Sequence, residues 1–255
     1  MTIGQHALFI LSVAVAGYVQ NLTGFAFGLV LLGLVGLLHV AALPDVANVV
    51  SVLTLVNAVA LFRSSRPQYE RAVMRPTLVA SLLGVLGGAL LLNWLSDNVV
   101  AGLRLLLGVT IVGCAWVLVI GSASRRQRSS TGTFAAFGLV SGVLGGLFST
   151  AGPPLVYHFY RQPMPLRAIR DALVGIFAAN AVVRMGLMLA TERVTVHAVW
   201  LSLEAVPLVL AQTYWMARHP PKWPPQTVKR LVCVLLLVVG VSLVGSSVRA
   251  LWGRV

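Results

Sequence analysis

The sequence has few charged residues and very few acidic ones. Charged residues make up 10% of the 255 positions, only six are Asp or Glu, and 58% are hydrophobic. A soluble globular domain has about one-quarter charged and one-half apolar residues, so this composition excludes one. The apolar runs are continuous and do not alternate, which excludes a transmembrane β-barrel. We therefore predict an all-α polytopic membrane protein.

Other absences narrow the function. The two cysteines, Cys114 and Cys233, lie in separate apolar runs without the spacing of a metal site or a disulfide framework. The sequence contains no GxxxxGK[ST] phosphate loop, so ATP is not expected to drive this chain. It also has no cluster of carboxylates or of His and Asp side chains, which argues against a membrane enzyme and against any cofactor or metal.

The excess of positive charge indicates topology. The formal net charge is +13, but the arginines lie at the ends of apolar spans and are not interleaved with stacking aromatics, so nucleic acid is not an expected partner. Basic residues gather in four loops, around 63–75, 125–128, 161–170 and 218–230. Cytoplasmic loops carry such an excess. We therefore place these loops in the cytoplasm and both chain termini outside.

The apolar runs form two similar halves, residues 1–125 and 126–255. Each half is expected to open with a broken or re-entrant helical segment and to continue with three transmembrane helices. The expected segments are 5–38, 47–62, 76–92 and 99–120 in the first half, and 134–160, 171–190, 198–216 and 228–250 in the second. With the basic loops on one side, corresponding helices run in opposite directions. The sequence thus predicts two inverted repeats, which are typical of secondary transporters.

Both broken segments are interrupted by polar or helix-breaking residues, Gln20–Gly24 in the first and Ser149–Pro154 in the second. Proline lacks an N–H group and disfavours a helical residue before it. A break inside a bilayer is tolerated only against protein or a water-filled cavity. We therefore predict that the breaks lie near the midplane and form the substrate site, as re-entrant or as fully spanning segments.

The second half resembles the sulfite exporter TauE/SafE family of bacterial inner-membrane permeases. The resemblance is carried by GLVSGVLGGLF at 138–148, by Gly152-Pro153-Pro154 and by the helix that contains Asn180. The first half departs from it, because Gly17–Gly24 reads GYVQNLTG where the family usually has consecutive glycines. The resemblance implies a multi-pass protein of the bacterial inner (plasma) membrane. It also implies transport of sulfite, organosulfonates or related small carboxylates.

An anion inside the membrane requires donors that are already oriented, and helix N-termini supply them through free N–H groups and the helix dipole. Together with polar residues of the breaks and spans, this predicts a substrate site made of Asn21, Thr23, Gly24, Asn57, Ser149, Thr150, Gly152, Pro153, Asn180 and Arg184. The alternative is structural: small residues and asparagines pack and bond helices, and an arginine snorkels to the interface.

Glu204 and His158 are the candidate proton-coupling residues, because ionisable groups inside a membrane are functional candidates by default. An ion pair of Glu204 with Arg184 or Arg104, and a packing role for His158, are the alternatives. The predicted function is a secondary transporter of small anions that works by alternating access. An anion channel and a carboxylate transporter remain alternatives, and coupling to protons or sodium ions and assembly as a homodimer stay open.

Overall fold

The computed structural model describes residues 2–64, 67–94, 127–149 and 153–219, together with a few positions between 105 and 116 and between 227 and 248. The described helices are α1 (Ile3–Thr23), α2 (Phe27–Leu38), α3 (Leu43–Ser64), α4 (Arg71–Trp94), α6 (Thr131–Phe148), α7 (Pro153–Tyr160), α8 (Leu166–Ala190) and α9 (Val196–Arg218). Six of them, all except α2 and α7, are long and apolar enough to cross a membrane. The prediction of an all-α polytopic membrane protein is confirmed. The predicted spans 99–120 and 228–250 lie outside the described residues, apart from the isolated positions just given.

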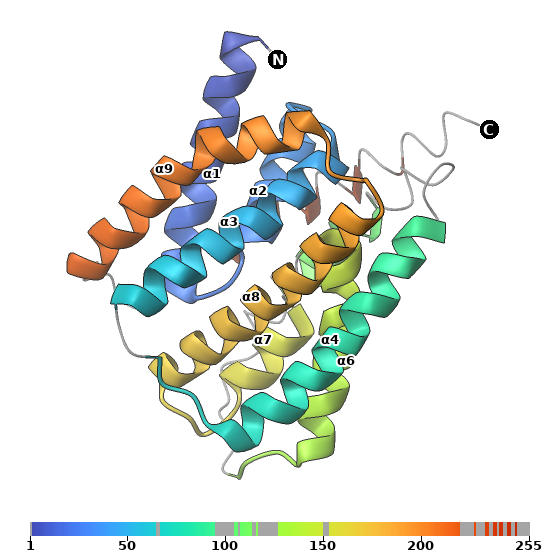
Figure 1. The fold of residues 1–255 in the computed structure, drawn as a ribbon. Coiled ribbons are helices and arrows are strands. Elements are labelled where there is room, and N and C mark those ends of the chain that lie inside the picture. Colours follow the sequence, from blue (N-terminus) through green and yellow to red (C-terminus); the bar gives the residue numbers. More distant parts are fainter. Residues whose placement is uncertain are drawn as a thin grey trace.

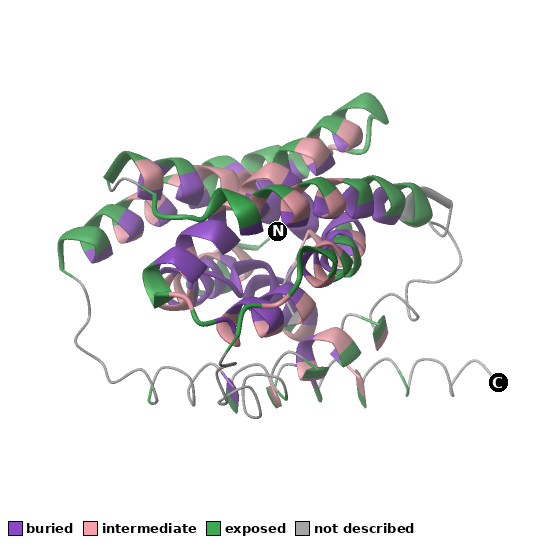
Figure 2. Ribbon diagram, turned by 90° about the horizontal axis from the view of Figure 1, so that it is seen from below, coloured by how far each residue is buried: buried purple, intermediate pink, exposed green. Residues whose placement is uncertain are grey.

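The described helices form two layers (Figure 1). One layer has the order α9, α3, α8, α4, and each helix contacts the next. The other layer contains α1 and α2 behind α9 and α3, and α7 and α6 behind α8 and α4. The surfaces where the layers meet are buried and the outward faces are exposed (Figure 2), as expected for helices whose outer sides face lipid.

Contacts between side chains give the helix directions in the first layer. Arg184, late in α8, donates to Asn48, early in α3, whereas Val174, early in α8, packs with Leu61, late in α3. These two central helices are therefore antiparallel.

The outer helices of this layer each run parallel to a central one. Asn57 of α3 accepts a hydrogen bond from Thr213 of α9, and the starts of these helices are joined by Asp45 and Thr195. At the other side, Ser81 of α4 bonds Asn180 of α8, and the side chain of Met74 lies close to Gly175.

Helices α4 and α6 make the closest packing in the described structure. Gly138 faces the backbone of Thr77, Gly142 faces Ser81 and Gly146 faces Val85, so the two helices run parallel with glycine at each contact. Small residues permit such close approach of backbones in membrane proteins. Because Ser81 also holds Asn180 of α8, this contact fixes part of the site described below.

Several helices begin earlier than the apolar pattern predicts. Helix α3 begins at Leu43 where the pattern predicts 47, and α4 begins at Arg71 where it predicts 76. Helix α8 begins at Leu166 and not at 171. The physical reason is that a helix extends into its polar ends, where hydropathy gives no signal. Proline at the second position of α3 is compatible with a first helical turn, because no intrahelical acceptor is lost there.

Both predicted breaks are present in the structure. Helix α1 ends at Thr23 with Gly24 in the left-handed conformation (φ 78°), and α6 ends at Phe148 with Ser149 at φ 58°. The helices before the breaks contain 21 and 18 residues, and the helices after them only 12 and 8. At a rise of about 1.5 Å per residue, the helix before each break is long enough to span the hydrocarbon core. The helix after each break is too short to do so.

Candidate functional site

A cavity lies between the first turn of α2, the last turn of α6 and one face of α8. It is lined by Gln20, Ala26, Phe27, Gly28, Leu29, Thr54, Gly145, Ser149, Phe177, Asn180, Ala181 and Arg184. Its volume, measured as the space open to the centres of waters, is ≈ 30 Å³. One water requires about 10–15 Å³ on this measure, so the cavity has room for two or three waters or for a compact anion.

Among the described residues, Arg184 is the only charged one that lines this cavity, and it is 2% exposed. Its Nη1 donates to the carbonyl of Ala47 at 3.3 Å, to Oδ1 of Asn48 at 3.0 Å and to Oγ of Ser51 at 3.1 Å. Its Nε donates to the carbonyl of Gly146 at 3.3 Å. Four neutral oxygens thus hold the guanidinium in place.

No carboxylate balances this charge within the described part of the chain. The ion pairs there join His6 to Glu204, Arg128 to Glu70 and Arg167 to Asp171. A buried charge without a counter-ion carries a large desolvation penalty. A bound anion would relieve that penalty, so the arrangement favours an anionic ligand beside Arg184.

The first turn of α2 adds backbone donors to the cavity. Its N-cap residue, Ala26, lies at φ 77° and makes no side-chain capping bond, while the N–H of Phe27 donates to Oε1 of Gln20 at 3.2 Å. Gly28 and Leu29 line the cavity. N–H groups of a first helical turn have no intrahelical acceptor, and the dipole makes this end positive. The turn is therefore suited to a negatively charged group.

Two predicted residues complete the polar wall. Ser149 ends α6 and its hydroxyl contacts that of Ser51, which also accepts a bond from Arg184. Asn180 exchanges hydrogen bonds with Ser81 at 2.7 and 3.1 Å. The structure thus brings three predicted residues, Ser149, Asn180 and Arg184, to one cavity.

Asn21 and Asn57 belong to a different cluster. Both are buried, and both contact the hydroxyl of Thr213 on α9: Thr213 donates to Asn57 at 2.7 Å and Asn21 donates to Thr213 at 3.4 Å. Neither asparagine lines the cavity. In this conformation Asn57 and Asn180 each join one half of the chain to the other and do not meet at one centre.

The remaining predicted residues of the breaks lie beside the cavity or outside the described residues. The hydroxyl oxygen of Thr23 lies 2.8 Å from the carbonyl oxygens of Val19 and Phe25, either of which can accept its one proton, and it closes the end of α1. Gly24 packs on the side chain of Arg170. Pro153 begins α7. Thr150 and Gly152 fall outside the described residues.

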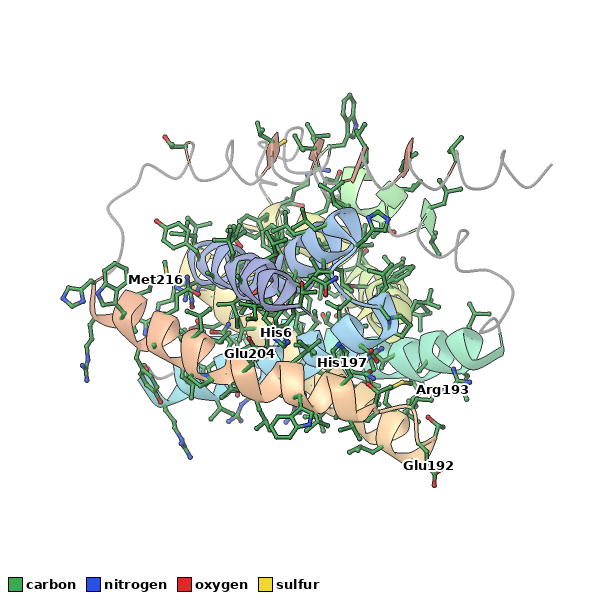
Figure 3. The ribbon with its side chains drawn as sticks, turned by 90° about the horizontal axis from the view of Figure 1, so that it is seen from above. His6, Glu192, Arg193, His197, Glu204 and Met216 are labelled. Atoms are coloured by element: carbon green, nitrogen blue, oxygen red, sulfur yellow. The ribbon has the colours of Figure 1, made fainter. Side chains whose placement is uncertain are left out.

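The two candidate proton-coupling residues lie away from the cavity lining. His158 is buried, stacks on Phe137 at 4.5 Å and meets Phe134 edge-on at 4.5 Å, which favours a packing role. Figure 3 shows His6 of α1 and Glu204 of α9 pointing toward one another, with Nδ1 and Oε2 2.8 Å apart. Glu204 therefore pairs with a histidine that the sequence did not indicate as its partner.

Several residues of the cavity wall and its support were not predicted from the sequence. Gln20 lies in the interrupted stretch already recognised, so its position gave a usable signal. Asn48, Ser51 and Ser81 are single polar residues within apolar spans and gave no such signal. They contact Arg184 or Asn180 from 99 to 136 residues away along the chain.

Two comparisons with known proteins find similar sequences. The family model described as "Sulfite exporter TauE/SafE" matches residues 9–243. The protein named "Probable sulfite/organosulfonate exporter TauE" from Cupriavidus necator is 32% identical over 233 residues, which cover 91% of each chain. No solved structure matches the chain.

Proposed function

The chain belongs to the sulfite exporter TauE/SafE family, and we propose that it carries sulfite or small organosulfonates by binding their anionic group at Arg184. Members of this family are transporters and not enzymes, and the six apolar helices make this chain a multi-pass membrane protein. The bacterial relative indicates the plasma membrane as its location.

The observation that carries the proposal is the buried guanidinium of Arg184 in a small cavity without a carboxylate partner among the described residues. Arginine presents several N–H donors in a planar array and binds oxyanions strongly. Sulfite and the sulfonate group offer three oxygens as acceptors. Ser149, Asn180 and the first turn of α2 line the same cavity, and a bound oxyanion would compete there for the bonds that Ser149 and Asn180 now make with Ser51 and Ser81.

We propose alternating access between two inverted halves as the mechanism. The helix order supports it: exchanging α9 with α4, α3 with α8, α1 with α6 and α2 with α7 leaves the two-layer arrangement unchanged. The central pair, α3 and α8, is antiparallel, as an inverted pair requires. Transporters with such repeats move one half against the other around a shared site.

The coupling ion is a separate part of the proposal. The pair of Glu204 and His6 is the proposed proton-binding group, because it joins a carboxylate and an imidazole at 2.8 Å on two helices that are long enough to cross the membrane. Coupling to sodium is the alternative to proton coupling. Assembly as a homodimer is compatible with either coupling ion.

Ligand-induced thermal stabilisation of the purified protein tests the proposal. A ligand that binds only the folded state at about 100 times its Kd stabilises by about 2.7 kcal/mol. We expect sulfite and a small sulfonate to raise the melting temperature of the wild type, and Arg184→Gln to abolish the rise. Arg128→Gln, which removes a charge from an exposed ion pair, is the matched control.

Three outcomes would change the conclusion. Equal stabilisation of Arg184→Gln and wild type would refute binding at this arginine. Stabilisation by acetate but not by sulfite or sulfonates would support the carboxylate alternative at the same site. Uptake that rises linearly with sulfite concentration would favour the channel alternative, because a carrier with one binding site saturates.

A further inference from the structure

The turn that joins α1 to α2 has two differently used faces. Ala26 and Phe27 line the cavity that holds Arg184. On the opposite side, the hydroxyl of Tyr160 donates to the carbonyl of Thr23 at 2.8 Å, and Phe25 meets the ring of Tyr160 edge-on at 5.9 Å. The turn therefore separates the cavity from the end of α7 and the start of α8.

Arg170 of α8 lies on this outer side of the turn. A Cβ atom added to Gly24 would lie 2.5 Å from Cγ and 3.2 Å from Cα of Arg170, so the two residues are in direct contact. Only glycine permits both this approach and the φ of 78° at position 24. Tyr160 and Arg170 also interact electrostatically.

Arg170 has unused binding capacity. Its Nε is buried and makes no hydrogen bond within the described residues. The neighbouring carboxylate, Asp171, interacts electrostatically with Arg170, but it accepts its hydrogen bond from the backbone N–H of Gln68 at 2.9 Å and lies 4.0 Å from Nε of Arg167. A buried donor without an acceptor costs free energy, so the position favours a ligand that supplies one.

Arg170 is part of the arginine-rich end of the bundle, where the basic loop between α7 and α8 lies. Arg161 in that loop packs over the ring of Tyr157 at 5.1 Å, and its Nε is also buried without an acceptor in the described structure. Clustered positive charge raises the local concentration of anions. By the distribution of basic loops this end faces the cytoplasm.

We infer that Arg170 and Tyr160 form a second anion site, where a small oxyanion such as sulfite docks on the cytoplasmic side before it reaches Arg184. This inference rests on the proposed function. The hydroxyl of Tyr160 has one proton to donate and now gives it to Thr23. An anion on Arg170 competes for that proton, and its binding therefore releases the turn that separates it from the cavity.

Sulfite uptake into membrane vesicles of both orientations tests the second site. In inside-out vesicles, which present the cytoplasmic face, we expect Arg170→Gln to raise the sulfite concentration for half-maximal uptake by about tenfold, the loss of one charge-assisted hydrogen bond. The maximal rate should stay near the wild-type value, and right-side-out vesicles should show no change in half-saturation.

Arg167→Gln is the matched control, because it removes the same charge three residues away from an exposed side chain. Arg170→Lys keeps the charge and removes the Nε donor, and it gives the test a second variant if Arg170→Gln does not fold. We expect a smaller rise in half-saturation for Arg170→Lys than for Arg170→Gln.

The second site is refuted if Arg170→Gln and Arg167→Gln have the same half-saturation, or if the change is equal in both vesicle orientations. Arg184→Gln distinguishes this failure from failure of the proposed function. If Arg184→Gln loses saturable uptake and Arg170→Gln behaves like the wild type, only the second site is refuted. If Arg184→Gln takes up sulfite as the wild type does, the proposed function is refuted, and the second site with it.

Discussion

Replacement of Gly142 by alanine tests whether the contact of α4 with α6 positions the substrate site. A Cβ atom at residue 142 would overlap the carbonyl oxygen of Ser81 and lie 2.8 Å from its carbonyl carbon and 2.9 Å from its Cα. Ordinary van der Waals contact begins at 3.4 Å. The two helices must therefore move apart by about an ångström to relieve the contact with the carbonyl oxygen, and all three contacting atoms are backbone atoms that cannot turn away.

The magnitude follows from two opposing terms. Overpacking a close contact costs about 1–3 kcal/mol, whereas alanine in place of glycine favours a helix by about 1 kcal/mol. We expect a net loss of about 1 kcal/mol in the free energy of unfolding, with an upper bound of about 2 kcal/mol. Because the hydroxyl of Ser81 holds Asn180 at the cavity wall, we also expect weaker sulfite binding.

Gly87→Ala is the control, since residue 87 lies in the same helix as Ser81 and has no atom within 4 Å of an added Cβ. It should gain about 1 kcal/mol from helix propensity alone. Both variants would be unfolded in detergent micelles with denaturant, and their sulfite affinities compared by thermal stabilisation. Equal stability of Gly142→Ala and Gly87→Ala would refute the close packing that this reasoning assumes.

Three further predictions address other parts of the molecule. Asn57→Ala and Thr213→Val should each destabilise the protein, and a double-mutant cycle should give a coupling energy of about 0.5–1.5 kcal/mol for their bond at 2.7 Å; additive effects would contradict a direct bond. Glu204→Gln should remove the pH dependence of sulfite flux and leave exchange of labelled for unlabelled sulfite intact, since its partner His6 then has no carboxylate to share a proton; an unchanged pH profile would exclude this pair as the coupling group. Gly24→Ala should lower the melting temperature and slow transport, because residue 24 has φ 78° and contacts Arg170; a variant with wild-type stability and flux would show that the turn tolerates a side chain.

The breaks of the helices were predictable from particular residues. Gly24 and the proline pair at 153–154 give local signals, because glycine adopts positive φ and proline cannot continue a hydrogen-bonded helix. The starts of α3, α4 and α8 were predicted less well, since those helices begin in polar segments where hydropathy changes little. The division between residues 125 and 126 stays a prediction.

The candidate site was only partly predictable. Arg184 and Asn180 stand out as polar residues inside apolar spans, and both line the cavity. Asn57 looks equivalent in the sequence, but it bonds Thr213 in a separate cluster. A pattern gives the depth of a residue in its span, whereas the rotation of the helix about its axis decides which neighbour it meets.

The sequence by itself determined the membrane class, the two interrupted segments and the presence of an arginine inside an apolar span. It did so because a bilayer requires long apolar helices, and departures from that requirement are visible in composition. The tertiary structure alone decided that Arg184 is held by neutral oxygens from α3 and α6 and faces a cavity that begins at α2. Those partners come from helices far apart in the chain, and close packing between helices, which no local pattern specifies, brings them together.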